Sequence, residues 1–503
     1  MNISEAKEYI KNSIRIYLKK DEYGDYKIPV VRQRPIFLLG APGIGKTAIM
    51  EQIAGELGIA LVSYSMTHHT RQSALGLPFI KEKEYGGKTV SVSEYTMSEI
   101  ISSIYETMEE SGVKEGVLFL DEINCVSETL APSMLQFLQY KVFGRHQVPE
   151  GWVIVTAGNP PEYNRSVREF DVVTMDRLKV LSVEADYPAW KAYAIEKGLH
   201  GAILNFLDVK KEYFYHMETT PEGRSYVTAR GWEDLSDIIT LYEEDKLKVN
   251  ENLISQYLSN DTIVREFAAY YDLYNKYKQD YRTDDLLNGK IGDSMLEKAG
   301  KAGLDERLSL MGILLNTIND EMKHILEQAD ALKEILPALK KVKDSEDIET
   351  GLRTQIEARK TILATKSAAG SLTPQEKKRH RGIQMLLEEM LVALGEKNSA
   401  EDITDTNKNS EKLGTYYNDK VKALKEATNV VSNRLHHLFV FTEKAFGSES
   451  NEMLVLVTEL TVGNTSARFI STFGSADYAK FNALLMVTDR KDALKEDIEK
   501  LVL

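Results

Sequence analysis

A glycine-rich loop near the N-terminus has residue types and spacing suited to binding phosphate. Residues 40–47 read GAPGIGKT and fit the pattern G-x-x-x-x-G-K-[ST], between an apolar run and a helical pattern. Backbone N–H groups of such a loop converge on phosphate oxygens, Lys46 adds a positive charge, and the Thr47 hydroxyl can ligate Mg²⁺. The pattern predicts a nucleoside triphosphate and Mg²⁺ as ligands. The predicted nucleotide-binding residues are Gly40, Ala41, Pro42, Gly43, Ile44, Gly45, Lys46, Thr47 and Ala48.

Two acidic residues follow a second apolar run. Residues 117–120 read VLFL and end in Asp121-Glu122. Ligands of open α/β sheets bind at the carboxyl ends of the strands, so these acids are expected beside the phosphate loop. We expect Asp121 to hold Mg²⁺ and Glu122 to orient and deprotonate an attacking water. A carboxylate aimed at water favours a hydrolase over a small-molecule kinase.

A third apolar run, Trp152–Thr156, leads into Asn159. A side-chain amide at a strand tip can donate to the γ-phosphate or position the water. Asn before Pro is also a common turn residue, and that simpler interpretation stays open. Asn159 is therefore a candidate site residue.

Short apolar runs and helical patterns alternate in the first 185 residues. The runs Ile36–Leu39, Ile59–Tyr64, Val117–Leu120, Trp152–Thr156 and Leu178–Val183 predict five buried strands. Strands separated by helices indicate a parallel sheet covered on both faces, which is an α/β fold. Past Pro188 the strand signals fade, and helical patterns predict an all-α remainder. Separate helices are expected at Glu306–Ile318 and Glu321–Ile335, and loops at Gly395–Gly414 and Gly447–Asn451.

Composition narrows the class of protein further. The chain has 503 residues, one cysteine and a formal charge of −14, and ten of its twelve prolines precede residue 233. The charge argues against nucleic acid as a partner, and the single cysteine excludes a disulfide framework within the chain. No apolar run is long enough to span a membrane. These features predict a cytoplasmic protein with a turn-rich front and a helical back.

The motifs, in this order, resemble those of the AAA+ ATPases, specifically the MoxR-like branch. The matching stretches are LLGAPGIGKTAI (38–49), LFLDEIN (118–124), GWVIVTAGNP (151–160), MDRLKVLSVEADYPAW (175–190) and TARGWEDLS (228–236). The resemblance implies a P-loop AAA+ core over residues 1–185 and a helical lid over 186–330. A helical extension (331–440) and a C-terminal helical segment packing back on the lid (441–503) would follow.

The family resemblance also assigns roles to individual residues. It implies a ring, usually a hexamer, with nucleotide between neighbouring subunits. Asn159 matches the sensor 1 position and Arg230 matches sensor 2, while Arg177 matches the arginine finger that reaches the next subunit's site. Arg165 and Arg168 lie on the same connection and are alternatives to Arg177.

The resemblance suggests a partner as well. It implies chaperone-like remodelling of a protein client, often a von Willebrand factor A domain protein. Insertions at 66–98 and 139–149, the second with a hairpin pattern, would touch the client or remain plain surface loops. The residues fit ATP and GTP alike. Two other functions stay open: an ATP-dependent scaffold or switch with little turnover, and a nucleic-acid-linked NTPase motor.

Overall fold

The computed structural model describes two compact units of the chain. The described residues are 1–68, 72, 74, 76–143, 145–163, 167–220, 223–343, 347–395 and 406–484. Met1–Ala189 and Ile356–Arg381 form the first unit, and Trp190–Gln355 and Gly382–Leu503 form the second. The predicted divisions at 330 and 440 lie inside single continuous helices, Leu304–Lys343 and Thr406–Phe446. The first segment of the first unit ends at Ala189, and the predicted boundary is at 185.

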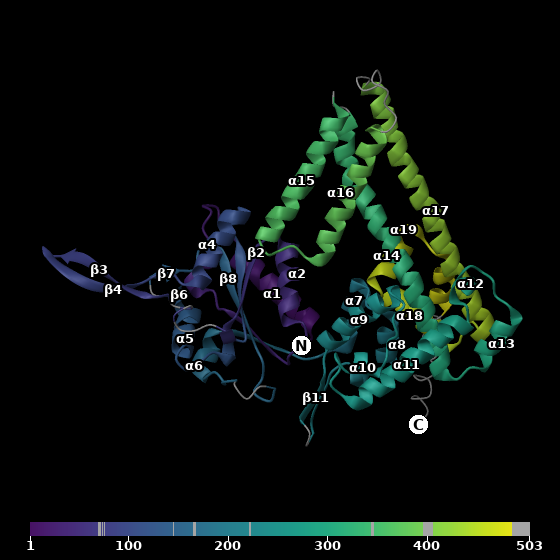
Figure 1. Ribbon diagram of the computed structural model, residues 1–503, viewed down its shortest axis with the longest axis horizontal. Coiled ribbons are helices and arrows are strands. Elements are labelled where there is room, and N and C mark those ends of the chain that lie inside the picture. Colours follow the sequence, from purple (N-terminus) through teal and green to yellow (C-terminus); the bar gives the residue numbers. More distant parts are fainter. Residues whose placement is uncertain are drawn as a thin grey trace, which may run out of the picture. The chain divides into compact units, whose positions relative to one another are not determined.

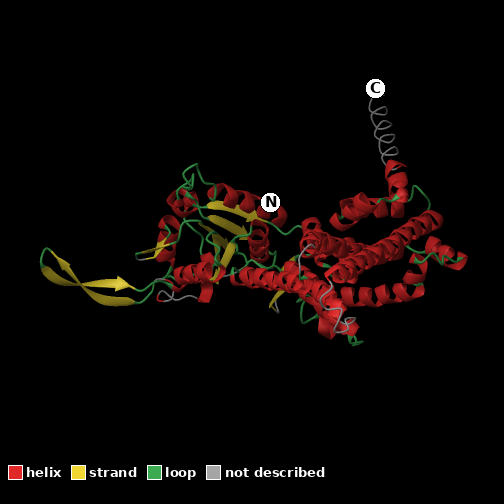
Figure 2. Ribbon diagram, turned by 90° about the horizontal axis from the view of Figure 1, so that it is seen from above, coloured by secondary structure: helices red, strands yellow, loops and turns green. Residues whose placement is uncertain are grey.

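A parallel five-stranded sheet forms the centre of the first unit (Figures 1 and 2). Its strand order is β2-β5-β8-β1-β9, and every neighbouring pair is parallel. The strands are β1 (Ile36–Gly40), β2 (Ala60–Ser65), β5 (Gly116–Asp121), β8 (Trp152–Gly158) and β9 (Lys179–Val183). The five predicted strands are confirmed, and the sheet with its helices is a P-loop AAA+ fold.

Helices cover this sheet on both faces, with α1 and α2 on one side and α4 and α5 on the other in Figure 1. The helices of this part are α1 (Ile3–Tyr17), α2 (Lys46–Leu57), α4 (Glu99–Ser111), α5 (Ala131–Tyr140) and α6 (Val172–Arg177), with short turns at Val30–Arg32, Met66–His68 and Ile123–Cys125. A buried cluster including Phe37, Leu118, Phe137 and Ile154 fills the space between strands and helices. Burial of these apolar side chains is the main stabilising contribution to the sheet.

A segment far along the chain completes the open edge of the sheet. Helices α15 (Ile348–Ala368) and α16 (Pro374–Gly395) cross from one unit to the other, and the turn between them belongs to the first. Leu61 N in edge strand β2 donates to Ala369 O over 2.8 Å, and the Ala369 side chain is 1% exposed. The turn therefore covers part of a strand edge that would otherwise present unpaired backbone groups.

Two antiparallel hairpins occupy the two predicted insertions. Strands β3 (Pro78–Tyr85) and β4 (Lys88–Tyr95) form a long arm within 66–98 (Figure 1). No strands were expected there from the sequence pattern. Strands β6 (Val142–Phe143) and β7 (His146–Gln147) form the hairpin predicted within 139–149.

The second unit is mostly helical. Its helices are α7 (Tyr187–Lys197), α8 (Gly201–Val209), α9 (Ala229–Glu244), α10 (Glu251–Ile254), α11 (Asp261–Asp280), α12 (Thr283–Leu287), α13 (Asp293–Lys301), α14 (Leu304–Lys343), α17 (Thr406–Phe446), α18 (Asn451–Val462) and α19 (Asn464–Phe473), with a short turn at Lys211–Tyr213. Side chains of α14, α17, α18 and α19 share one buried cluster, which includes Met311, Phe439, Leu456 and Phe469.

The structure corrects three expectations for this helical part. Strands do occur past Pro188, because β10 (His216–Thr220) and β11 (Gly223–Val227) form a hairpin. The helices expected at Glu306–Ile318 and Glu321–Ile335 are one helix, α14, which also contains Pro337. The loop expected over Gly395–Gly414 is helical from Thr406, and residues 396–405 lie outside the described residues. The loop predicted at Gly447–Asn451 is confirmed up to Ser450.

Candidate active site

The strand order brings three chain segments to one edge of the sheet. Strand β8 lies between β5 and β1, so Asn159, which follows β8, lies between the acids that end β5 and the phosphate loop after β1. Parallel strands place their carboxyl ends at a common edge, and ligands of open α/β sheets bind there. The predicted residues of all three segments therefore meet.

The phosphate loop has the backbone geometry that an anion site needs. Gly43 and Gly45 have φ values of 75° and 94°, in the left-handed region that glycine adopts without strain. Helix α2 begins at Lys46, directly after this turn. The loop amides and the helix N-terminus thus lie next to each other, and together they favour a bound phosphate group.

Lys46 lies within the loop and is 8% exposed. Its Nζ donates to the carbonyls of Gly40 and Ala41, both at 2.7 Å, and to Asn159 Oδ1 at 2.9 Å. A buried ammonium group needs such acceptors. The contact with Asn159 places the tip of β8 beside the lysine, and the role of Asn159 at the γ-phosphate stays a prediction.

Thr47 and Asp121 meet at the first turn of α2. Thr47 Oγ1 donates to Asp121 Oδ2 over 2.9 Å. A hydroxyl and a carboxylate are oxygen ligands of the kind that Mg²⁺ takes, usually together with phosphate and water oxygens. Among the described residues no group of three His, Cys, Asp or Glu side chains could hold a metal. The Thr47–Asp121 pair fits a Mg²⁺ ion that takes phosphate and water oxygens as its other ligands.

Glu122 has an unusual backbone and two hydroxyl partners. Its φ of 55° lies in the left-handed region, which is strained for a residue with a side chain. Ser65 Oγ at 2.9 Å and Thr67 Oγ1 at 3.0 Å are both within hydrogen-bonding distance of Glu122 Oε2. The sequence analysis missed both residues. Their position becomes apparent only when the strand order is known, because Ser65 ends strand β2 and pairs with Asp121 at the end of β5.

Asn124 is a second site residue that the sequence analysis missed. It is 4% exposed and lies in the short turn after Glu122. Its Nδ2 donates to the main-chain oxygen of Asn159 over 2.8 Å. The turn that carries Glu122 is thus joined to the tip that carries Asn159.

The three candidate finger arginines differ in their surroundings. Arg177 ends α6, is exposed, and makes no hydrogen bond with any described residue. Arg168 forms an ion pair with Glu128. Arg165 lies outside the described residues. Of the two described arginines, Arg177 is the one that forms no ion pair with a described carboxylate within 4 Å, although its charge acts on Asp171.

Helix α6 is held in place by its N-cap. The Asp171 carboxylate accepts from Thr174 N over 2.7 Å. Hydrogen bonds from the side chain and the backbone of Thr174 lower the pKa of Asp171 below its usual value, and the Arg177 charge lowers it to a smaller extent. Val172 and Val173 on the first turn are 85% and 58% exposed. An arginine and two apolar side chains thus share an exposed short helix.

Arg230 belongs to the second unit. It is the second residue of α9, it is exposed, and the Thr228 hydroxyl caps this helix by accepting from Gly231 N. Its predicted role as sensor 2 stays a prediction.

The two hairpins of the first unit contact each other. Arg145 Nη1, in the β6–β7 turn, donates to Glu94 Oε1 of β4 over 2.8 Å, and His146 Nε2 lies 3.3 Å from Tyr95 O. The arm itself exposes apolar side chains, including Ile80 at 79%.

Lys141, at the base of the short hairpin, is a buried lysine with 1% of its surface exposed. Its Nζ donates to Val30 O, and burial lowers the pKa of Lys141 to about 8.

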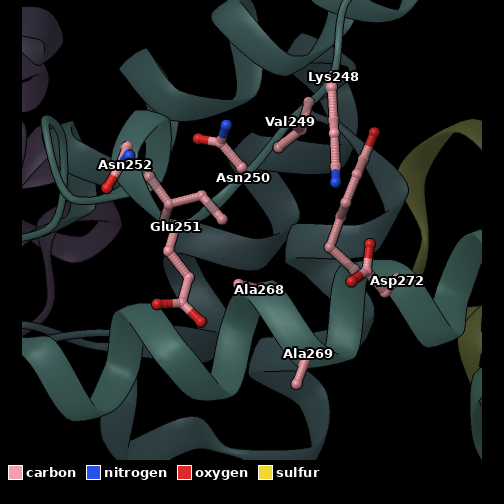
Figure 3. Close-up of a pocket in the computed structure, with 10 residues that line it drawn as sticks. Lys248, Val249, Asn250, Glu251, Asn252, Ala268, Ala269 and Asp272 are labelled. Atoms are coloured by element: carbon pink, nitrogen blue, oxygen red, sulfur yellow. The ribbon is translucent and has the colours of Figure 1, made fainter.

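A polar pocket in the second unit has no part in this arrangement. It has a volume of about 490 Å³ and lies where residues 248–254 meet α11 (Figure 3). Lys248, Glu251 and Asp272 supply charged groups of both signs, and Ala268 and Ala269 form part of one wall. None of the predicted site residues lines it.

Comparison with known families agrees with the geometry. Residues 36–174 match the family described as "ATPase family associated with various cellular activities (AAA)". A comparison with curated proteins finds no match. Within the described residues, no helix combines the length and apolarity needed to cross a bilayer. Together with the parallel sheet and the phosphate loop, this match to part of the first unit indicates an AAA-type ATPase domain with the geometry of a nucleotide-binding site.

Proposed function

We propose that this protein is a MoxR-type AAA+ ATPase that hydrolyses ATP with Mg²⁺ and uses the energy to remodel a protein partner. The observation that carries the proposal is the convergence of Lys46, Thr47, Asp121, Glu122 and Asn159 at one edge of the sheet, linked by hydrogen bonds. A site that only binds nucleotide needs the first three. Glu122 and Asn159 add the groups that hydrolysis needs.

Each residue would have a separate task in the reaction. The loop amides and Lys46 would bind the phosphates, and Thr47 and Asp121 would hold Mg²⁺, which neutralises phosphate charge. Glu122 would orient the attacking water and take its proton. Asn159 would hold the γ-phosphate or that water from the other side.

A ring of subunits, most simply a hexamer, completes the proposed site. The exposed guanidinium of Arg177 would enter the neighbour's site and stabilise charge in the transition state. The exposed Val172 and Val173 beside it support a protein contact on this helix. The exposed apolar side chains of the β3–β4 arm favour binding of a protein client. The client that we propose is a von Willebrand factor A domain protein in the cytoplasm.

The decisive substitution is Glu122→Gln. It keeps size and polarity but removes the proton acceptor, so steady-state ATP turnover is expected to fall at least about 10²-fold while ATP still binds. Phosphate release measures turnover, and equilibrium titration with a fluorescent ATP analogue measures binding. Glu109→Gln on the exposed face of α4 is the matched control and should turn over ATP like the wild type. Turnover near the wild-type rate in Glu122→Gln would refute the proposed role of Glu122 in hydrolysis.

One observation favours a second function, an ATP-dependent switch with little turnover. Ser65 and Thr67 both contact the Glu122 oxygen that would otherwise face water. An engaged carboxylate would slow hydrolysis, and ATP binding alone would then set the state of the protein. A wild-type phosphate-release rate as low as that of an inactive Glu122→Gln variant, with and without a protein partner, would favour the switch.

A further inference from the structure

Asn124 connects three segments of the candidate active site. Its Nδ2 donates to Asn159 O over 2.8 Å, and its own main-chain oxygen accepts from Arg168 N over 2.9 Å. It lies two residues after Glu122, in a turn closed by the hydrogen bond from Cys125 N to Glu122 O, 2.9 Å long. One side chain therefore lies between the acid after β5 and the tip of β8.

The amide of Asn124 also packs tightly against the end of β8. A Cβ atom placed on Gly158 would lie 2.5 Å from Asn124 Oδ1 and 2.7 Å from its Cγ, closer than any van der Waals contact allows. Only glycine fits at 158 while this amide is in place. The distance between the Glu122 turn and the Asn159 tip is thus fixed both by a hydrogen bond and by direct packing.

The amide is retained at a cost. Asn124 Oδ1 is fully buried and has no hydrogen-bond partner among the described residues. A buried acceptor without a partner is unfavourable, and an apolar side chain of similar shape would avoid that cost. The donor group of the amide, which an apolar side chain would lack, reaches the backbone of Asn159.

The contacts continue to the phosphate loop. Asn159 Oδ1 accepts from Lys46 Nζ over 2.9 Å, so the residue whose backbone Asn124 holds also touches the phosphate-binding lysine. We propose that Asn124 is a positioning residue for hydrolysis: it sets Asn159 against Glu122, so that turnover depends on it and nucleotide binding does not. This inference rests on the proposed function.

The first test is Asn124→Ala, with kcat and KM measured separately. Misplacement of reacting groups by about 1 Å can lower a rate about 10²-fold. We expect kcat to fall at least about tenfold, while KM and the affinity for a fluorescent ATP analogue change less than about threefold. Asn124→Asp keeps the shape but removes the donor and turns a carboxylate oxygen toward Asn159 O, so it should lower kcat at least as much.

The packing contact gives a second and independent test. Gly158→Ala introduces the clashing Cβ and should lower kcat in the same way. In the double variant Asn124→Ala/Gly158→Ala the amide is absent, so the added methyl group has space and should cost little further activity. The double variant should therefore match Asn124→Ala, and a fully additive loss would contradict the proposed contact.

The chain contains a matched control outside the site. In the second unit Asn205 is 5% exposed, and a Cβ atom on Gly312 would lie 2.3 Å from its Oδ1. Asn205→Ala removes a comparable buried amide and should lower the thermal unfolding midpoint without a selective loss of kcat. If Asn124→Ala lowers the unfolding midpoint as Asn205→Ala does but keeps the wild-type kcat, Asn124 is merely structural and the inference is wrong.

The outcomes separate this inference from the proposed function. An inactive Glu122→Gln together with a fully active Asn124→Ala overturns the positioning role alone. A fully active Glu122→Gln overturns the catalytic role proposed for Glu122, and the positioning role of Asn124 with it. If Asn124→Ala does not fold, the same kcat and KM measurements on two other variants test the positioning role. These variants are the isosteric Asn124→Asp and the separate Gly158→Ala.

Discussion

At the scale of single residues, the chemistry of the site depends on side chains that the nucleotide motifs do not include. Lys46, Thr47, Asp121, Glu122 and Asn159 follow from sequence because glycine spacing, paired acids and strand tips have recognisable patterns. Ser65, Thr67 and Asn124 have no such pattern, because hydroxyl and amide residues are common in turns throughout the chain. Their roles depend on which strands are neighbours, which the structure shows.

The first prediction at this scale concerns the hydroxyl groups on Glu122. The double variant Ser65→Ala/Thr67→Val removes both contacts to Oε2 and leaves the carboxylate free for water, so we expect basal ATP turnover to rise several-fold. Steady-state phosphate release measures the change. Ser63→Ala, at an exposed position of the same strand, is the control and should not change turnover. A tenfold fall in the double variant would show instead that the hydroxyls orient Glu122 for catalysis.

At the scale of elements, the sequence predicts the sheet well and the connections poorly. Strands such as Val117–Leu120 are buried on both faces and read as unbroken apolar runs, which few other structures produce. The arm strands β3 and β4 are almost fully exposed and lack this signal. Helix α14 continues past its midpoint because packing along its length outweighs weak local breaks in the pattern.

The docking of the α15–α16 turn on β2 could not be predicted from the sequence, because it joins residues about three hundred positions apart.

A substitution at Gly370 tests whether this turn protects the edge strand. Gly370 has a φ of 63°, and a Cβ atom there would lie 2.5 Å from Leu61 O. Gly370→Ala should weaken docking by about 1–3 kcal/mol. Hydrogen exchange at the Leu61 amide, which donates to Ala369 O, should then become faster by at least about threefold.

The control for this variant is Gly382→Ala. Gly382 is an exposed glycine in α16, and a Cβ atom there would meet nothing within 4 Å. Alanine favours helix over glycine, so this change should leave exchange at Leu61 unaltered. Unchanged exchange in Gly370→Ala as well would show that the turn does not protect the edge strand.

At the scale of the whole molecule, the prolines are concentrated in the N-terminal part of the chain, which contains the parallel sheet, and are rare in the helical part. Most of the prolines lie in the part of the chain that forms the sheet and its short turns. In the long helices, Pro337 lies inside α14 and Pro374 is the first residue of α16. Proline is tolerated in the first turn of a helix and disfavoured in its interior. The sequence therefore predicts the character of each half, although not the return of residues 356–381 to the first unit.

The proposed ring makes a prediction at this scale. Arg177→Ala and Lys46→Ala subunits should each be inactive alone, because one lacks the trans-acting arginine and the other cannot bind phosphate. Mixed subunits create some interfaces with both residues, so ATP turnover should reappear. Mixing Arg177→Ala with a Lys46→Ala/Arg177→Ala double variant is the control and should stay inactive. If co-assembled mixtures never regain activity, Arg177 is not the finger, and Arg168 or Arg165 takes its place.

The central claim is that Glu122 converts bound ATP into ADP at the edge of this sheet. The direct measurement is the chemical identity of nucleotide that stays bound after incubation with ATP and Mg²⁺, separated by chromatography from wild type and Glu122→Gln. We expect mainly ADP on the wild type and mainly ATP on the variant. Mainly ADP on Glu122→Gln, formed as fast as on the wild type, would contradict it.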